Sequence, residues 1–105
     1  MLDLPIVCSL TEPELQQRRE AVFSRIAALV QERRALDNGY ALRFAAEDAI
    51  LEELIRLIQL ERVCCPFLQF RLIVEQSGGP VWLELVGPEG TRAFLEAELG
   101  LQAHS

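Results

Sequence analysis

The chain has 105 residues, of which half are hydrophobic and a quarter are charged, and its formal net charge is −6. A chain of this size and composition is expected to form one domain, and no apolar run approaches the roughly 20 residues that span a bilayer. The acidic excess lies in residues 47–105, which carry ten acidic residues and four arginines. Such a surface repels phosphate backbones and anionic lipids, so we expect no nucleic-acid partner and no membrane partner.

The N-terminus and the cysteine count point to a reducing compartment. The first five residues lack the basic segment and the apolar stretch of a signal peptide, so we expect a cytoplasmic protein. The sequence has three cysteines, an odd number, and two of them are adjacent. We therefore expect free thiols and no structural disulfide framework.

Residues 2–10 are the first predicted element. Apolar and other residues alternate there, which predicts a strand with Cys8 on the same face as Ile6. Cys8 also comes just before a predicted helix, whose N-terminal dipole favours a thiolate. Of the three cysteines, Cys8 is therefore predicted to be the most reactive, and it is the nucleophile if the protein carries out thiol–disulfide chemistry.

A helix is predicted to begin at the capping box that follows this strand. Thr11 is the predicted N-cap, Glu14 lies three residues on, and Pro13 stands in the first turn, where its missing N–H is harmless. An amphipathic stripe then predicts a helix to about Arg34, ended by the turn signal of residues 37–39.

In the second half of the chain, segments with the alternation of a strand follow segments with the apolar stripe of a helix. Carboxylates at Glu47 and Asp48 favour the start of a second helix, and Ser77 to Pro80 form a turn signal between two alternating segments. The predicted elements are a strand over 40–44, a helix over about 47–64, a β-hairpin of strands 68–75 and 81–86, and a last helix over 91–99, begun by Thr91 and stopped by Gly100.

These elements give the order βαβαββα in one α/β (α+β) domain over residues 1–100, followed by a mobile tail, 101–105, that holds the only histidine, His104. A helical crossover between the first two strands would make them parallel, so we expect a mixed four-stranded sheet. We prefer a two-layer sandwich, because polar residues alternate along three strands and indicate one wet sheet face. The alternative is a thioredoxin-like fold, with Cys8 at the first strand–helix junction and Cys65-Pro66 before the third strand.

Residues 61–70, Glu-Arg-Val-Cys-Cys-Pro-Phe-Leu-Gln-Phe, form the most distinctive stretch. Proline disfavours helical geometry in the residue before it and has no N–H to donate, so the helix must end at Cys65-Pro66. Together with Gly79-Pro80-Val81-Trp82-Leu83 and residues 87–90, this stretch resembles a group of small uncharacterised bacterial proteins over most of the chain length. The resemblance implies no particular activity.

The best functional hypothesis is a thiol protein that binds a soft metal or metalloid ion. Thiolates are the ligands that select such ions, and Cys8, Cys64 and Cys65 could form a trigonal site. Zinc usually takes four protein ligands, and the only histidine is in the predicted mobile tail, so zinc is less favoured than other soft ions. The residues expected to support the site are Thr11, Glu61, Arg62 and Pro66.

Two other functions stay open. In a thiol–disulfide redox protein, Cys8 would attack and one of the adjacent cysteines would resolve the mixed disulfide. In a structural or interaction module, the cysteines would be buried as small apolar residues, and Glu61 and the arginine pairs would be solvated. The sequence completes no known catalytic set, and it leaves open a protein partner or a homodimer, with Trp82 a candidate contact.

Overall fold

A computed structural model describes residues 12–99 of the chain. Three helices and four strands follow one another in the order αββαββα. The helices are α1 (Pro13–Leu29), α2 (Asp48–Cys64) and α3 (Thr91–Leu99), and the strands are β1 (Glu32–Leu36), β2 (Gly39–Phe44), β3 (Gln69–Val74) and β4 (Val81–Val86). The predicted single α/β domain is confirmed.

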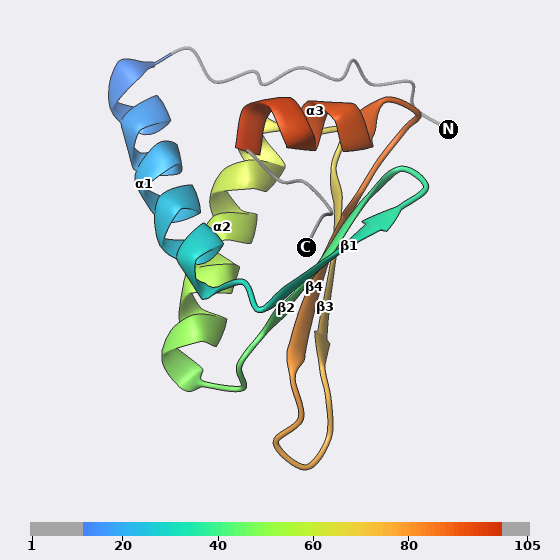
Figure 1. Cartoon of the computed structure of the whole chain (residues 1–105). Coiled ribbons are helices and arrows are strands. Elements are labelled where there is room, and N and C mark those ends of the chain that lie inside the picture. Colours follow the sequence, from blue (N-terminus) through green and yellow to red (C-terminus); the bar gives the residue numbers. More distant parts are fainter. Residues whose placement is uncertain (1–11, 100–105) are drawn as a thin grey trace.

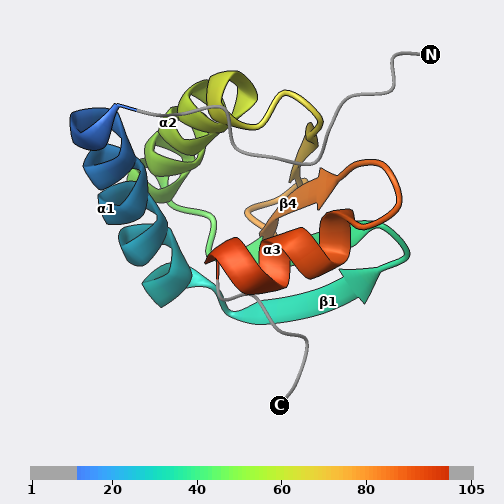
Figure 2. The ribbon, with the colours of Figure 1, turned by 90° about the horizontal axis from the view of Figure 1, so that it is seen from above.

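The four strands form one sheet in the order β1-β2-β4-β3, and every neighbouring pair is antiparallel. All three helices lie on the same side of this sheet (Figures 1 and 2). Helices α1 and α2 run side by side, and α3 lies across the end of the sheet near the β1–β2 turn. The preferred two-layer arrangement therefore describes the fold.

The core lies between the sheet and the helices. Alternate residues of the two central strands point into it and are nearly inaccessible to solvent: Tyr40, Leu42, Phe44, Val81, Leu83 and Leu85. The helices cover them with Val22, Ile26, Leu54, Leu57 and Leu95. The opposite sheet face carries Trp82, which is partly buried and stacks under the Arg34 guanidinium at 4.7 Å from the ring centroid. Trp82 is therefore on the face away from α3.

The predicted extension of the first helix to Arg34 is wrong. Helix α1 ends at Leu29, and residues 32–36 form β1, which pairs with β2 across a tight turn at Asp37 and Asn38. Residues such as Glu, Arg, Ala and Leu favour helices locally, but pairing in a hairpin overrides that preference here. As an edge strand, β1 can carry charged side chains, which discourage pairing with further chains.

The predicted N-cap is also wrong, because the structure places Glu12 at that position, without a side-chain capping bond. Thr11, the predicted strand over 2–10 and the predicted tail over 101–105 lie outside the described residues. The predicted mixed sheet rested on that first strand, and the four strands from β1 to β4 form an antiparallel sheet. The Cys65–Pro66 peptide is trans, since residues 12–99 hold no cis peptide. These features remove the support for the thioredoxin-like alternative.

Within residues 12–99, no helix is both long enough and apolar enough to cross a bilayer.

Candidate thiol site

The candidate site lies where α2 ends. The N–H of Cys65 still donates to the carbonyl of Glu61 at 2.7 Å, which closes the last helical turn. Pro66 then stops the helix, and Leu68 N–H bonds back to the Cys65 carbonyl at 3.0 Å. This contact closes a turn with proline at its second position, which suits the fixed proline φ. The prediction that Pro66 sets the exit from the helix is confirmed.

The turn carries the two cysteines into the core. Cys64 is 1% exposed and Cys65 is 0% exposed, and the next two apolar residues, Phe67 and Leu68, are buried as well. Phe67 meets Phe94 of α3 edge to face, with 5.0 Å between ring centroids. The turn that follows the cysteines is therefore packed against α3.

A buried ion pair stands beside the cysteines. Arg19 of α1 donates from Nε to Glu61 Oε1 at 2.6 Å and from an Nη atom to Oε2 at 3.4 Å. Glu61 is fully buried and Arg19 is 9% exposed. The same guanidinium lies 3.8 Å from the Cys65 sulfur. Arg19 thus links α1 to both polar groups at the end of α2.

The structure corrects two expectations here. The structural alternative expected Glu61 and the arginine pairs, of which Arg18-Arg19 is one, to be solvated, but Glu61 and Arg19 are both buried. The signal was in the sequence: Arg19 stands three residues before Val22 and seven before Ile26, on the apolar stripe of α1. Glu61 likewise follows Leu57 by four residues on the apolar stripe of α2. Opposite charges on two buried stripes predict an ion pair, because an isolated buried charge is costly.

The two adjacent cysteines differ in chemical state. Cys64 is one half of a disulfide, whereas Cys65 is a free thiol. The expectation that all cysteines are free thiols is therefore wrong for Cys64. Cys8, the third cysteine of the chain, lies outside the described residues.

The surroundings of Cys65 keep its thiol protonated. Burial raises its pKa from 9.0 to about 12, the negative charge of Glu61 adds to the rise, and the positive charge of Arg19 partly opposes it. Because the thiolate is the reactive form, Cys65 is a weak nucleophile near neutral pH.

Three donor groups converge in this place. One carboxylate oxygen of Glu61 and the sulfur atoms of Cys64 and Cys65 all lie within 4.8 Å of one another, and all three residues are buried. Of the other predicted supporting residues, Arg62 and Pro66 are exposed. A pair of sulfurs with one oxygen suits a soft or borderline cation, once both sulfurs are thiols.

Comparison with family models, with curated proteins and with solved structures finds no match for this chain. The resemblance to small bacterial proteins stays a prediction, and the function must be argued from the site itself.

Proposed function

We propose that the chain is a thiol protein that binds a soft metal or metalloid ion through Cys64 and Cys65, with Cys8 as a further ligand. The observation that carries the proposal is the convergence of Glu61, Cys64 and Cys65 donor atoms within 4.8 Å in a buried position. A chelating site needs donor atoms that are held close together, and an ion that binds thiols displaces their protons. Burial behind α3 would also limit access of water and competing ligands.

Charge balance favours a divalent ion. Without metal, the Arg19 and Glu61 charges cancel each other, and the Cys65 thiol is neutral. A divalent cation that displaces the protons of two thiols leaves this balance unchanged, whereas a monovalent cation leaves one buried negative charge in excess. Because an uncompensated buried charge is costly, a site made of the Cys64 and Cys65 thiolates favours a soft divalent ion. If Cys8 also binds as a thiolate, a trivalent metalloid ion keeps the same balance.

Glu61 has two roles open to it in such a site. Its Oε1 atom is held by Arg19 at 2.6 Å, and its Oε2 atom has a longer contact of 3.4 Å with the same side chain. Oε2 is therefore the more available of the two oxygens as a ligand. If it does not bind the ion, Glu61 still fixes the guanidinium beside the Cys65 sulfur.

The oxidation state of Cys64 determines whether the site can bind an ion. A sulfur in a disulfide has no thiolate to offer, so the ion binds only after two electrons and two protons have converted the disulfide to two thiols. The chain holds three cysteines and Cys65 is free, so Cys8 is the partner that we propose for Cys64 within one chain. Reduction would then release the Cys8 and Cys64 thiols together, beside the Cys65 thiol, which is already free.

The experiment is a titration of the fully reduced, chelator-treated chain with Cd²⁺, followed by its thiolate charge-transfer absorption in the ultraviolet. We expect one Cd²⁺ per chain, and loss of tight binding in Cys64→Ser and in Cys65→Ser. The matched control is Glu52→Gln, an exposed carboxylate on the same helix, which should bind like the unchanged chain. Binding that survives both cysteine substitutions, or no binding in the reduced chain, would end the proposal.

A second candidate function is thiol–disulfide exchange, and the disulfide at Cys64 is the observation that favours it. Cys8 would attack a substrate disulfide as a thiolate, and Cys64 would then displace the substrate thiolate from the mixed disulfide. The products are two substrate thiols and an oxidised Cys8–Cys64 pair, so electrons and protons balance. Cys65, with its raised pKa, would take no part.

Mass spectrometry separates the two functions. If the protein is a redox protein, the fully reduced chain treated with excess oxidised glutathione should lose two hydrogens, and reduced Cys65→Ser should do the same. Cys64→Ser should instead retain glutathione as a stable mixed disulfide on Cys8. If neither glutathione nor Cd²⁺ reacts as described, and the cysteine variants change stability alone, the cysteines are structural.

A further inference from the structure

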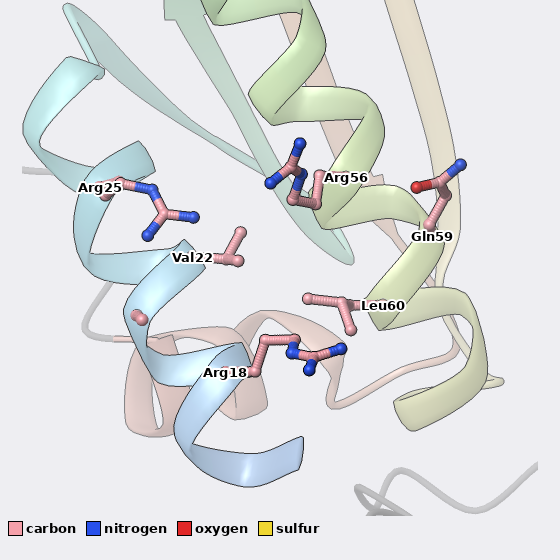
Figure 3. A pocket seen from close by; sticks show the side chains of 7 residues that line it. Arg18, Val22, Arg25, Arg56, Gln59 and Leu60 are labelled. Atoms are coloured by element: carbon pink, nitrogen blue, oxygen red, sulfur yellow. The ribbon is translucent and has the colours of Figure 1, made fainter. Parts of the chain in front are cut away.

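A second candidate site lies on the outside of the helical layer. A hollow of about 440 Å³ opens between α1 and α2, lined by Arg18, Ala21, Val22, Arg25, Arg56, Gln59 and Leu60. In Figure 3, Arg18 and Arg25 come from α1 and Arg56 comes from α2, while Val22 and Leu60 point toward each other between the helices. We call this hollow the arginine groove. Its volume is within the range of small-molecule sites.

The charge of the arginine groove is opposite to that of the chain. The net charge of the protein is −6, yet three of its ten arginines border this one hollow. Arg25 has a long contact with Glu53, 3.4 Å from Nη2 to Oε2, and both groups are partly exposed. Among the ion pairs and side-chain hydrogen bonds of residues 12–99, none involves Arg18 or Arg56. Two guanidinium groups thus line the groove without an ion pair to a described carboxylate, and Glu52 lies beside Arg56 in the neighbouring hollow.

The floor of the groove is apolar. Leu60 is partly buried and offers hydrocarbon surface beneath the arginines, whereas Val22 is 1% exposed and closes the bottom of the groove. A second hollow, of about 350 Å³, continues over α2 and shares Arg56 and Gln59 with the first. It adds Leu51, the exposed carboxylate of Glu52, and Ile55, which is 45% exposed. The apolar surface therefore extends on one side of the arginines.

We propose that the arginine groove binds a small organic oxyanion, a carboxylate or phosphate monoester that carries an apolar group. Guanidinium groups bind either oxyanion with paired, charge-assisted hydrogen bonds. The anionic end would lie between Arg18 and Arg56, and the apolar group would cover Leu60 and extend toward Ile55. This site is separate from the thiol site, so its occupancy does not depend on the oxidation state of Cys64.

The test is a titration of the ¹⁵N-labelled full chain with phenyl phosphate, followed by amide NMR shifts. We expect changes concentrated in residues 18–25 and 51–60, with a dissociation constant of about a millimolar or below, as suits a small ligand at an open site. Benzoate and inorganic phosphate, titrated in the same way, separate the two oxyanions and the contribution of the ring. Benzyl alcohol, which has no charge, should bind at least about tenfold more weakly.

Two variants and one control keep the proposal open to refutation. Arg18→Gln and Arg56→Gln should each weaken phenyl phosphate binding by about tenfold, the loss expected for a hydrogen bond to a charged group. Arg71→Gln makes the same charge change on β3, away from the groove, and should bind like the unchanged chain. Shifts spread over the whole surface, equal losses in all three variants, or no shifts at millimolar ligand would overturn the proposal.

Discussion

Cys65 shows how strongly one residue depends on its surroundings. Its side chain is inaccessible to solvent, and its pKa is raised from 9.0 to about 12 by burial and by the Glu61 charge. In the unfolded chain the thiol ionises near its ordinary pKa, while the folded chain keeps it protonated. The resulting stabilisation is complete below about pH 9 and is lost as the pH rises toward about 12.

We therefore predict that the free energy of unfolding falls above pH 9, by up to about 1.4 kcal/mol per pH unit from this thiol alone. Urea unfolding at several pH values, compared between the unchanged chain and Cys65→Ala, measures the difference. The variant should be less stable at neutral pH, and its disadvantage should shrink as the pH rises. A constant difference from pH 7 to pH 11 would show that the thiol has an ordinary pKa.

The buried Arg19–Glu61 ion pair is a second feature on which the stability of the fold depends. Removing one member leaves the other charge buried without a partner, and such changes cost about 3–5 kcal/mol. We predict that Arg19→Met and Glu61→Leu each destabilise the fold by this amount, while the double variant recovers most of the loss. Denaturant unfolding of the four proteins in a double-mutant cycle measures the coupling. The exposed pair of Arg25 and Glu53 is the control, where the coupling should stay below about 1 kcal/mol. Additive losses at Arg19 and Glu61 would mean that the two charges do not depend on each other.

At the scale of elements, local patterns predict most of the fold. The alternation in 81–86 and the apolar stripe of the second helix depend on burial of one face. The strand has the predicted bounds, and the helix predicted over about 47–64 spans 48–64. Strand β1 could not be predicted in this way, because an exposed edge strand needs no apolar alternation, and residues 32–36 have helix-favouring side chains. The site was only partly predictable: the cysteine pair and Pro66 are adjacent in sequence, whereas Arg19 meets Glu61 across 42 positions.

The β1–β2 hairpin depends on one glycine. A Cβ at Gly39 would lie 1.9 Å from the Leu85 carbonyl oxygen, which is a backbone atom of the neighbouring strand β4. We predict that Gly39→Ala costs about 3 kcal/mol or more, because the strands must separate to admit the methyl group. The comparison is Gly78→Ala, where no atom lies within 4 Å but φ is +72°. Its cost should be about 1 kcal/mol, from backbone strain alone. Thermal unfolding of both variants shows which one loses more stability. A larger loss of stability in Gly78→Ala than in Gly39→Ala would contradict the close approach at Gly39.

For the whole molecule, the proposed metal site joins the two layers of the fold. Its ligands leave α2 at the turn into β3, α1 supplies the balancing Arg19, and α3 covers the turn through Phe94. An ion that binds only the assembled site must stabilise the entire domain, by about 2.7 kcal/mol when its free concentration is a hundred times the dissociation constant. In a domain of this size that corresponds to a rise in melting temperature of about 10 °C or more.

We predict that Cd²⁺ raises the melting temperature of the reduced chain by this amount, and that the rise is smaller at pH 6 than at pH 8. The pH dependence follows from displacement of thiol protons by the ion, since the Cys65 pKa of about 12 leaves the thiol protonated at both values. The oxidised chain is the internal control, because Cys64 in a disulfide offers no thiolate, and its melting temperature should not respond. Differential scanning calorimetry, with and without Cd²⁺, measures the melting temperatures of the reduced chain, the oxidised chain and reduced Cys65→Ser. An equal rise in the oxidised chain or in the variant would place the ion on surface carboxylates, away from the end of α2.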